Sequence, residues 1–184
     1  MHRNTIEIDN SLLVVVDVQE AFRTAIPDFA VIVSRIALAI RGFQVLGVPV
    51  VVTEQYPKGL GHTAEELALT LTEDTDVIEK STFSAFGEPS FVSTIEKYEA
   101  KQIALCGVEA HVCVNQTAHD LLDAGYDVHL LTDCVASRYE HDKRAGIDKM
   151  LGSGAVSSSM EMALFEMMRD SRHEKFKEVQ ALIK

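Results

Sequence analysis

The chain has 184 residues, of which 47% are hydrophobic and 24% are charged, a composition typical of one soluble globular domain. Its formal net charge of −11 argues against a nucleic-acid-binding surface, because such a surface needs a basic patch to neutralise phosphates. No apolar run approaches the roughly 18 residues of a membrane span, and the opening segment MHRNTIEIDN lacks the apolar core of a signal peptide. Three cysteines, an odd number, do not suggest a disulfide framework, so we predict a protein of the reducing cytoplasm.

Short runs rich in β-branched residues recur along the chain, and each predicts a strand. They are apolar throughout rather than alternating, as expected for parallel strands covered by helices on both faces. In chain order the runs are 11–17, 48–54, 76–80, 102–108, 126–133 and 154–159.

Helical patterns lie between these runs. Apolar spacing predicts a helix over 29–46, and helical patterns predict three more over 93–99, 111–124 and 142–151. A last, polar helix is expected over roughly 172–184. Thr63-x-x-Glu66 and Ser158-x-x-Glu161 have the form of capping boxes and predict two further helix starts. The alternation indicates one α/β domain over 1–184 with a mostly parallel sheet, and the methionine-rich stretch 158–168 is expected in the core or at a subunit contact.

Right-handed crossovers limit the order of these strands. If the first three strands wind one way and the next three the other, the order is 3-2-1-4-5-6. Ligands then bind at the carboxyl ends of strands 1 and 4, where the winding reverses. Strand 1 ends at Asp17 and strand 4 leads to Cys113, while Lys80 ends strand 3 at the same edge. The topology therefore predicts that these three side chains share one crevice.

The three residues allow either a structural or a chemical interpretation. A lone cysteine is more often core packing, but the N–H groups and dipole of a first helical turn would favour a Cys113 thiolate. Asp17 could be a turn carboxylate and Lys80 a solvated lysine. Together they offer a general base, a charge stabiliser and a nucleophile. Cys106, inside an apolar strand, and Cys134, after strand 5, are expected to be structural.

Other classes of site lack their motifs. Strand 1 is followed by DVQEAF without the glycines of a dinucleotide site, and there is neither a P-loop nor a G-x-S-x-G elbow. Gln19 stands where a phosphatase of the D-x-D type would have its second aspartate. Neither a Cys-x-x-Cys nor an H-E-x-x-H pair suggests zinc. We therefore expect no metal and no cofactor.

Five segments, in this order and at these spacings, resemble the isochorismatase-like cysteine hydrolases over nearly the whole chain. They are VVVDVQEAF (14–22), VVVTEQYPKGLGHT (50–63), EKSTFSAF (79–86), LCGVEAHVCV (105–114) and LLTDCVASR (130–138). The stretches TEQYPKGLG and GVEAHVCV are most similar to the subgroup of isochorismatase domain-containing protein 2.

The resemblance implies a three-layer α/β/α fold with a six-stranded parallel sheet in the order 3-2-1-4-5-6. It implies a catalytic triad of Asp17, Lys80 and Cys113. It also implies a cis peptide between Val108 and Glu109, after which the backbone N–H groups of Glu109 and Cys113 would form an oxyanion hole.

Two departures from family patterns bear on the substrate. Nicotinamidases of the family carry a D-x-H metal motif after strand 2, whereas this chain has Glu54-Gln55-Tyr56, which argues against a metal and against nicotinamide. Members that cleave the vinyl ether of isochorismate can lack the cysteine, so its presence favours covalent chemistry. Phe22, Gln55 and Phe83 are candidate substrate contacts, with core packing as the alternative for the two phenylalanines.

The predicted function is a cysteine hydrolase that cleaves a small amide-like or imide-like C–N bond through a thioester. Its expected partners are a small-molecule substrate and further copies of itself, without nucleic acid or membrane. A non-catalytic scaffold on the same fold is the alternative. A nuclease is a third possibility, and the acidic charge speaks against it.

Overall fold

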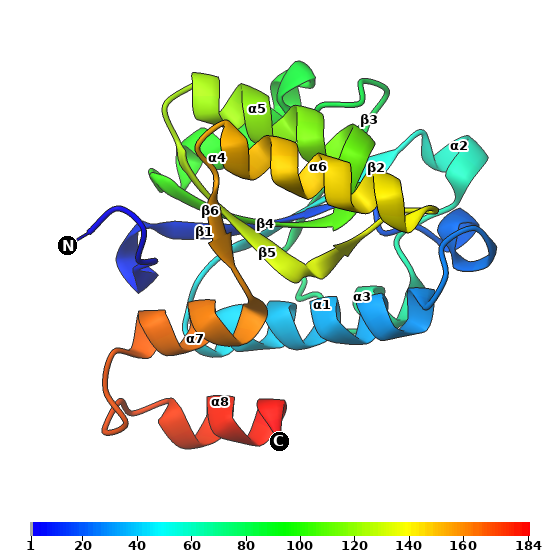
Figure 1. Ribbon diagram of the computed structural model, residues 1–184. Helices are drawn as coiled ribbons and strands as arrows, with labels where there is room; N and C mark the ends of the chain where they lie inside the picture. Colours follow the sequence, from blue (N-terminus) through cyan, green and yellow to red (C-terminus); the bar gives the residue numbers. More distant parts are fainter. Residues whose placement is uncertain (1) are drawn as a thin grey trace.

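The apolar runs of the sequence form one parallel sheet in a computed structural model that describes residues 2–184 (Figure 1). The strand order is β3-β2-β1-β4-β5-β6 and every neighbouring pair is parallel, which confirms the predicted order. The strands are β1 (Ser11–Val16), β2 (Val50–Gln55), β3 (Asp76–Lys80), β4 (Gln102–Val108), β5 (Asp127–Ala136) and β6 (Val156–Ser158).

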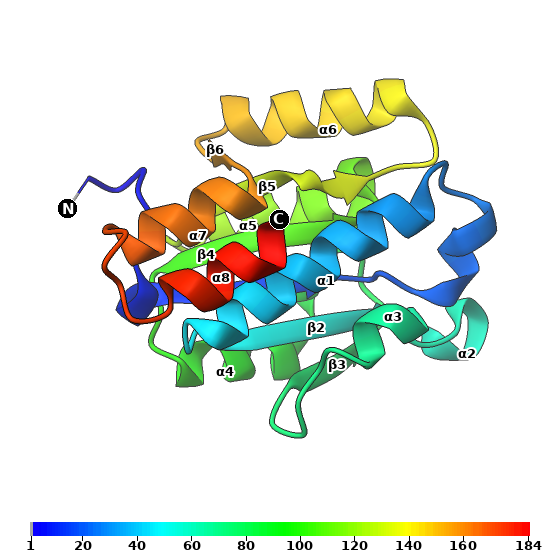
Figure 2. The same ribbon diagram turned by 90° about the horizontal axis from the view of Figure 1, so that it is seen from below.

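Helices cover both faces of the sheet and give the predicted three layers (Figures 1 and 2). On one face lie α4 (Pro89–Lys97), α5 (Asn115–Asp123) and α6 (Glu140–Gly152). On the other face lie α1 (Phe29–Val45), α3 (Glu65–Ala68) and α7 (Met160–Met168), and α8 (Phe176–Ile183) packs against α1. The short α2 (Pro57–Leu60) follows β2 at the carboxyl edge. No helix in the described part of the chain is long and apolar enough to cross a membrane.

Strand β1 lies at the centre of the sheet and contributes side chains to both hydrophobic cores. Leu13 and Val15 face the α1 side, while Leu12, Val14 and Val16 face the α5 side, and all five are fully buried. This double burial is why the strand is apolar at every position. Because β1 is paired with β2 on one side and with β4 on the other, its last residue lies in the middle of the carboxyl edge of the sheet.

Several predicted helix starts differ from the structure, because side chains near them bond elsewhere. Thr63 does not cap a helix; its hydroxyl donates to the Glu54 carboxylate, 2.7 Å away. Helix α7 begins one residue later than predicted, since Ser159 rather than Ser158 accepts from the Met162 N–H. Helix α4 begins at Pro89 instead of 93, with Glu88 as its cap.

Gly107 in β4 is required by the close approach of β1. Its φ of 121° lies in the region that favours glycine, and a Cβ atom there would overlap the Val16 carbonyl oxygen.

We expect Gly107→Ala to lower the free energy of unfolding by more than about 3 kcal/mol, measured by urea denaturation. Gly152→Ala in α6 is the matched control, because its Cβ would enter open space. Equal stability of the two variants would contradict this packing argument.

His129 is a fully buried histidine in β5 whose two ring nitrogens have no hydrogen-bond partner among the described residues. Burial lowers its pKa below the usual 6.5, although the charges of Glu166 and Asp127 oppose the shift, as does a contact with the Arg3 backbone that falls short of hydrogen-bond geometry. The folded protein therefore binds this proton less tightly than the unfolded chain, so stability is full above 6.5 and falls as the pH drops below it.

We expect His129→Leu to weaken this acid-induced loss of stability. The measurement is the urea midpoint at about pH 7.5 and about pH 5.5, where wild type should lose more than the variant. His141→Leu, at a well exposed position, is the control and should lose as much as wild type. The same loss in His129→Leu and wild type would contradict the assignment.

Candidate active site

Three polar side chains from separate strands meet at the carboxyl edge of the sheet. Asp17 directly follows β1, Lys80 is the last residue of β3, and Cys113 follows β4. Asp17 has a φ of 53°, an uncommon conformation for a residue with a side chain, and this turns the chain away from the strand direction. The order β3-β2-β1-β4 brings the three residues to one edge although they are far apart in the sequence.

Asp17 and Lys80 form a buried ion pair. Lys80 Nζ lies 2.7 Å from Asp17 Oδ2, and both side chains are almost completely inaccessible to water. The other carboxylate oxygen, Oδ1, accepts a hydrogen bond of 2.7 Å from the hydroxyl of Thr53 in β2. Both oxygens of the carboxylate therefore have a donor, as a buried charge requires.

The Lys80 ammonium is held by four oxygen atoms. Besides Asp17, its acceptors are Gln55 Oε1 at 2.7 Å and the carbonyl oxygens of Thr82 and Phe83, each at 3.0 Å. These contacts fix both the ammonium and the loop that follows β3. Because Lys80 and Asp17 neutralise each other, the pair offers no free charge to a ligand.

Cys113 lies in η4 (Ala110–Val114), a π-helical turn between β4 and α5. The predicted helix over 111–124 is thus an α-helix only from Asn115, and Cys113 is not in its first α-helical turn. The extra residue of a π turn re-aims side chains, and such turns are frequent at functional sites. Cys113 is 8% exposed, and the peptide bond between Val108 and Glu109, just before the turn, is cis.

The surroundings of the Cys113 thiol favour its protonated form. Burial is the main cause that raises its pKa from 9.0 to about 12, and the nearby Asp17 carboxylate raises it further while the Lys80 ammonium lowers it. The expectation of a thiolate rested on a first α-helical turn, whereas Cys113 lies in the π turn before Asn115, where burial and the carboxylate favour the protonated thiol. Burial also raises the pKa of the Cys106 and Cys134 thiols in the core.

Removing the carboxylate should make the thiol more acidic. In Asp17→Asn the anion that raises the Cys113 pKa is gone, while Lys80, which lowers it, remains. More thiolate is then present at about pH 8, so we expect iodoacetamide to alkylate Cys113 faster than in wild type. Mass spectrometry of the modified peptide measures the rate, with Cys106 as internal control. An unchanged or slower rate at Cys113 would contradict this electrostatic account.

Sequence reasoning missed Gln19, a fully buried side chain that joins three loops. Its Oε1 accepts from the Gln55 N–H at 2.7 Å, and its Nε2 donates to the carbonyls of Gln55 at 3.0 Å and Gly61 at 2.6 Å. The sequence pattern marks Gln19 only as the residue that stands in place of the second aspartate of a D-x-D motif. The position of a glutamine two residues after Asp17 gives no signal for these distant partners.

Glu54 occupies the place of the metal motif of nicotinamidases, and its carboxylate is already satisfied. It accepts from the Thr63 N–H at 2.6 Å, from the Thr63 hydroxyl at 2.7 Å and from His62 Nδ1 at 2.9 Å. No group of three or more acidic, histidine or cysteine side chains in residues 2–184 has the arrangement of a metal site.

The three candidate substrate contacts lie in different environments. Phe22 is partly buried against the core on the α1 side. Gln55 bonds Lys80 and also donates to the Ser81 carbonyl at 2.8 Å, so its side chain is engaged within the protein. Phe83 is 56% exposed beside the carbonyl that Lys80 holds, and Tyr56 is similarly exposed. Phe83 is therefore the one of the three with a free aromatic face at the rim.

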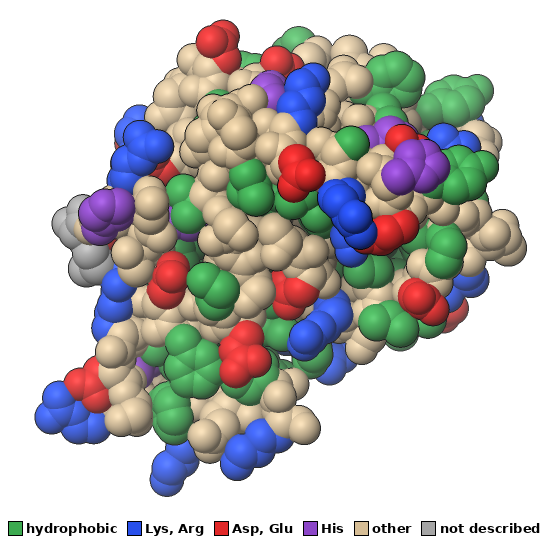
Figure 3. Space-filling view, in the orientation of Figure 1, with side chains coloured by type: hydrophobic (Ala, Val, Ile, Leu, Met, Phe, Trp, Pro, Cys, Tyr) green, Lys and Arg blue, Asp and Glu red, His purple; other side chains and the backbone are tan. Residues whose placement is uncertain are grey.

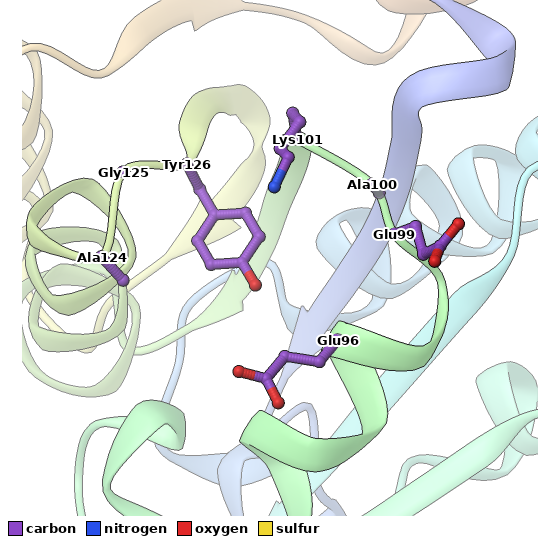
Figure 4. A pocket seen from close by; sticks show the side chains of 7 residues that line it. All are labelled: Glu96, Glu99, Ala100, Lys101, Ala124, Gly125 and Tyr126. Carbon is purple, nitrogen blue, oxygen red and sulfur yellow. The ribbon is translucent and has the colours of Figure 1, made fainter.

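Two hollows on the surface differ in their relation to these residues. One of about 520 Å³ lies at the amino edge of the sheet, where Figure 4 shows Tyr126 and Lys101 projecting into it and Glu96 nearby. A smaller hollow of about 270 Å³, lined by Tyr56, Lys80 and neighbouring residues, lies at the carboxyl edge. Only the second adjoins the buried ion pair.

The parallel sheet with its switch point between β1 and β4 is an open α/β fold, and an acid, an amine and a thiol gather at its carboxyl edge. A model of the isochorismatase domain matches residues 11–162, so the chain belongs to the isochorismatase family. The sequence prediction of this family is confirmed.

Relatives from both animal subgroups are similar to the chain. Isochorismatase domain-containing protein 1 of Salmo salar is 40% identical over 168 residues, which are 91% of this chain. The chain spans only 59% of the length of that relative. Isochorismatase domain-containing protein 2 of Xenopus laevis is 39% identical over 95% of this chain and 83% of its own length.

Solved structures share the fold closely. A chain described as the MAR1 ribonuclease of Caenorhabditis elegans has a TM-score of 0.92 at 40% identity, covering 97% of this chain and 92% of its own. The YcaC gene product of Escherichia coli, described as an octameric hydrolase of unknown specificity, has a TM-score of 0.91 at 21% identity, covering 97% of this chain and 89% of its own. The second likeness concerns the fold alone.

Proposed function

We propose that this protein is a cysteine hydrolase that cleaves a small, neutral amide-like or imide-like C–N bond through a thioester on Cys113. The observation that carries the proposal is the position of the Cys113 thiol beside a buried, lysine-paired carboxylate. A carboxylate in this position can take the thiol proton when a carbonyl carbon approaches. The family membership supports a hydrolase in general.

The first half of the reaction forms the thioester. Asp17 takes the proton of Cys113 as the sulfur attacks the carbonyl carbon, and the backbone N–H groups of Glu109 and Cys113 stabilise the oxyanion. Removing one such donor costs about 2.7–4 kcal/mol in other hydrolases. The intermediate collapses, the C–N bond breaks, and the leaving nitrogen takes the proton from Asp17. Lys80 Nζ, 2.7 Å from Asp17 Oδ2, holds the carboxylate in place.

The second half releases the acid. Asp17 takes a proton from a water molecule, whose oxygen attacks the thioester carbon. The C–S bond then breaks, and the sulfur regains the proton from Asp17. Asp17 and Cys113 end the cycle as they began it, because the thiol proton leaves on the nitrogen and a proton from water replaces it, so the cycle consumes only water. A neutral substrate fits this site, because Asp17 and Lys80 neutralise each other.

The test is a screen of small primary amides and cyclic imides for release of ammonia or ring opening. Wild type should turn over at least one class, and Phe83→Ala should raise KM, because Phe83 offers an exposed ring at the rim. The scaffold alternative predicts no turnover at all. We also propose that the protein is a homo-oligomer, which native mass spectrometry of the same sample tests. We propose the cytoplasm as its location.

A second candidate is RNA cleavage, which the description of the Caenorhabditis elegans relative as a ribonuclease favours. The net charge of −11 opposes it, and Lys and Arg side chains are interspersed with Asp and Glu over most of the face in Figure 3. Incubation with labelled single-stranded RNA at low salt distinguishes RNA cleavage from amide hydrolysis. Cleavage that Asp17→Asn abolishes would support the nuclease, and intact RNA would leave the amide hydrolase.

A further inference from the structure

The turn that carries Cys113 is tied to the end of β5 by side chains that the proposed chemistry does not use. Glu109 Oε1 accepts from both the backbone N–H and the Nε of Arg138, each at 3.0 Å. Two residues along the turn, His111 Nδ1 lies 3.0 Å from the hydroxyl of Ser137. Four residues, Glu109, His111, Ser137 and Arg138, therefore connect the turn to the end of β5.

Helix α6 presses on the same turn from the other side. Gly146 approaches so closely that a Cβ atom would lie 2.8 Å from the Ala110 carbonyl oxygen and from His111 Cα. The second ring nitrogen of His111, Nε2, lies 3.9 Å from Asp142 Oδ2 at the start of α6. His111 therefore stands between β5 and α6, with one ring nitrogen directed to each.

We propose that His111 is a positioning residue, which through Ser137 holds the turn so that the N–H groups of Glu109 and Cys113 meet the oxyanion. This inference rests on the proposed function. Ser137 is suited to anchor the ring, because it is only 6% exposed and directly follows β5. The hydrogen bond at Nδ1 restricts rotation of the planar imidazole and thereby helps to hold the backbone that bears it.

Two reactions of Cys113 separate positioning from mere exposure. Alkylation by iodoacetamide needs a reachable sulfur in its thiolate form but no donors for an oxyanion. Acetylation by 4-nitrophenyl acetate also needs N–H donors placed on the oxyanion. In the acetylation the S–C bond forms, the ester C–O bond breaks, nitrophenolate leaves with the electron pair, and Asp17 receives the thiol proton. The ratio of the two rates therefore reports the geometry of the turn.

In His111→Ala we expect acetylation of Cys113 to slow about tenfold or more, while alkylation changes by less than about threefold. Nitrophenolate absorbance and mass spectrometry of the labelled peptide measure the two rates. His141→Ala is the matched control, because His141 Nε2 lies 3.6 Å from the other oxygen of the same Asp142 but belongs to α6 and not to the turn. Both rates should stay at the wild-type value there.

Two further variants test the hydrogen bond itself. His111→Asn can place a polar atom near the Nδ1 position and should recover most of the acetylation rate. Ser137→Ala should lose as much as His111→Ala, and the double variant should lose no more, since both remove one interaction. If His111→Ala does not fold, Ser137→Ala carries the test.

The outcomes separate this inference from the proposed function. Unchanged acetylation in His111→Ala and Ser137→Ala, or both rates moving together, would overturn the positioning role while the thioester chemistry stands. A wild-type protein that is never acetylated at Cys113 would contradict both the positioning role and the proposed thioester chemistry.

Discussion

Replacing Lys80 with methionine should destabilise the protein by about 3–5 kcal/mol, the usual cost of leaving one partner of a buried ion pair alone. Methionine is close to lysine in length and removes the charge, so the buried Asp17 carboxylate loses its charged partner while the Thr53 hydroxyl remains as a donor. The carbonyl oxygens of Thr82 and Phe83 lose their donor at the same time. Urea denaturation followed by circular dichroism measures the change.

The double variant Asp17→Asn with Lys80→Met provides the control. It removes both charges, so it should unfold at higher urea concentration than Lys80→Met alone. It should not reach wild type, because the two carbonyl oxygens still lack a donor. A Lys80→Met protein as stable as wild type would contradict the buried ion pair.

Replacing Cys113 with alanine should lower kcat by about 10⁴-fold or more on any amide that wild type hydrolyses, as loss of the nucleophile does in other covalent hydrolases. The change deletes one sulfur atom at a position that is 8% exposed, so the fold should survive. Cys106→Ala and Cys134→Ala are matched controls, since both remove a buried thiol from β4 or β5 without touching the edge. Equal loss in all three variants would point to stability rather than chemistry.

Much of the fold could be predicted from local pattern. Six apolar runs without alternation indicate parallel strands, and the handedness of crossovers then leaves few orders. The carboxyl ends of β1, β3 and β4 follow from that order, so the meeting of Asp17, Lys80 and Cys113 needed no tertiary information. Residues at strand ends are placed by the sheet, which is why this part of the site was predictable.

The remaining features depend on contacts that sequence spacing does not encode. The π turn at Ala110–Val114 forms where β4, β5 and α6 converge, and a helical pattern alone predicts an ordinary α-helical turn. The thiol pKa follows from how deeply Cys113 is buried beside Asp17, which a helix-dipole argument omits. Thr63 has the spacing of a helix cap, yet Glu54 competes for its hydroxyl from another strand.

The central claim is the thioester on Cys113, and trapping it is the most direct test. Wild type is mixed with a hydrolysed amide, quenched in acid within the first turnovers, and digested for mass spectrometry. We predict the acyl group of the substrate on the peptide that contains Cys113, its removal by hydroxylamine, and its absence in Cys113→Ala. Turnover that proceeds without any such adduct, and at the same rate in Cys113→Ala, would contradict the account.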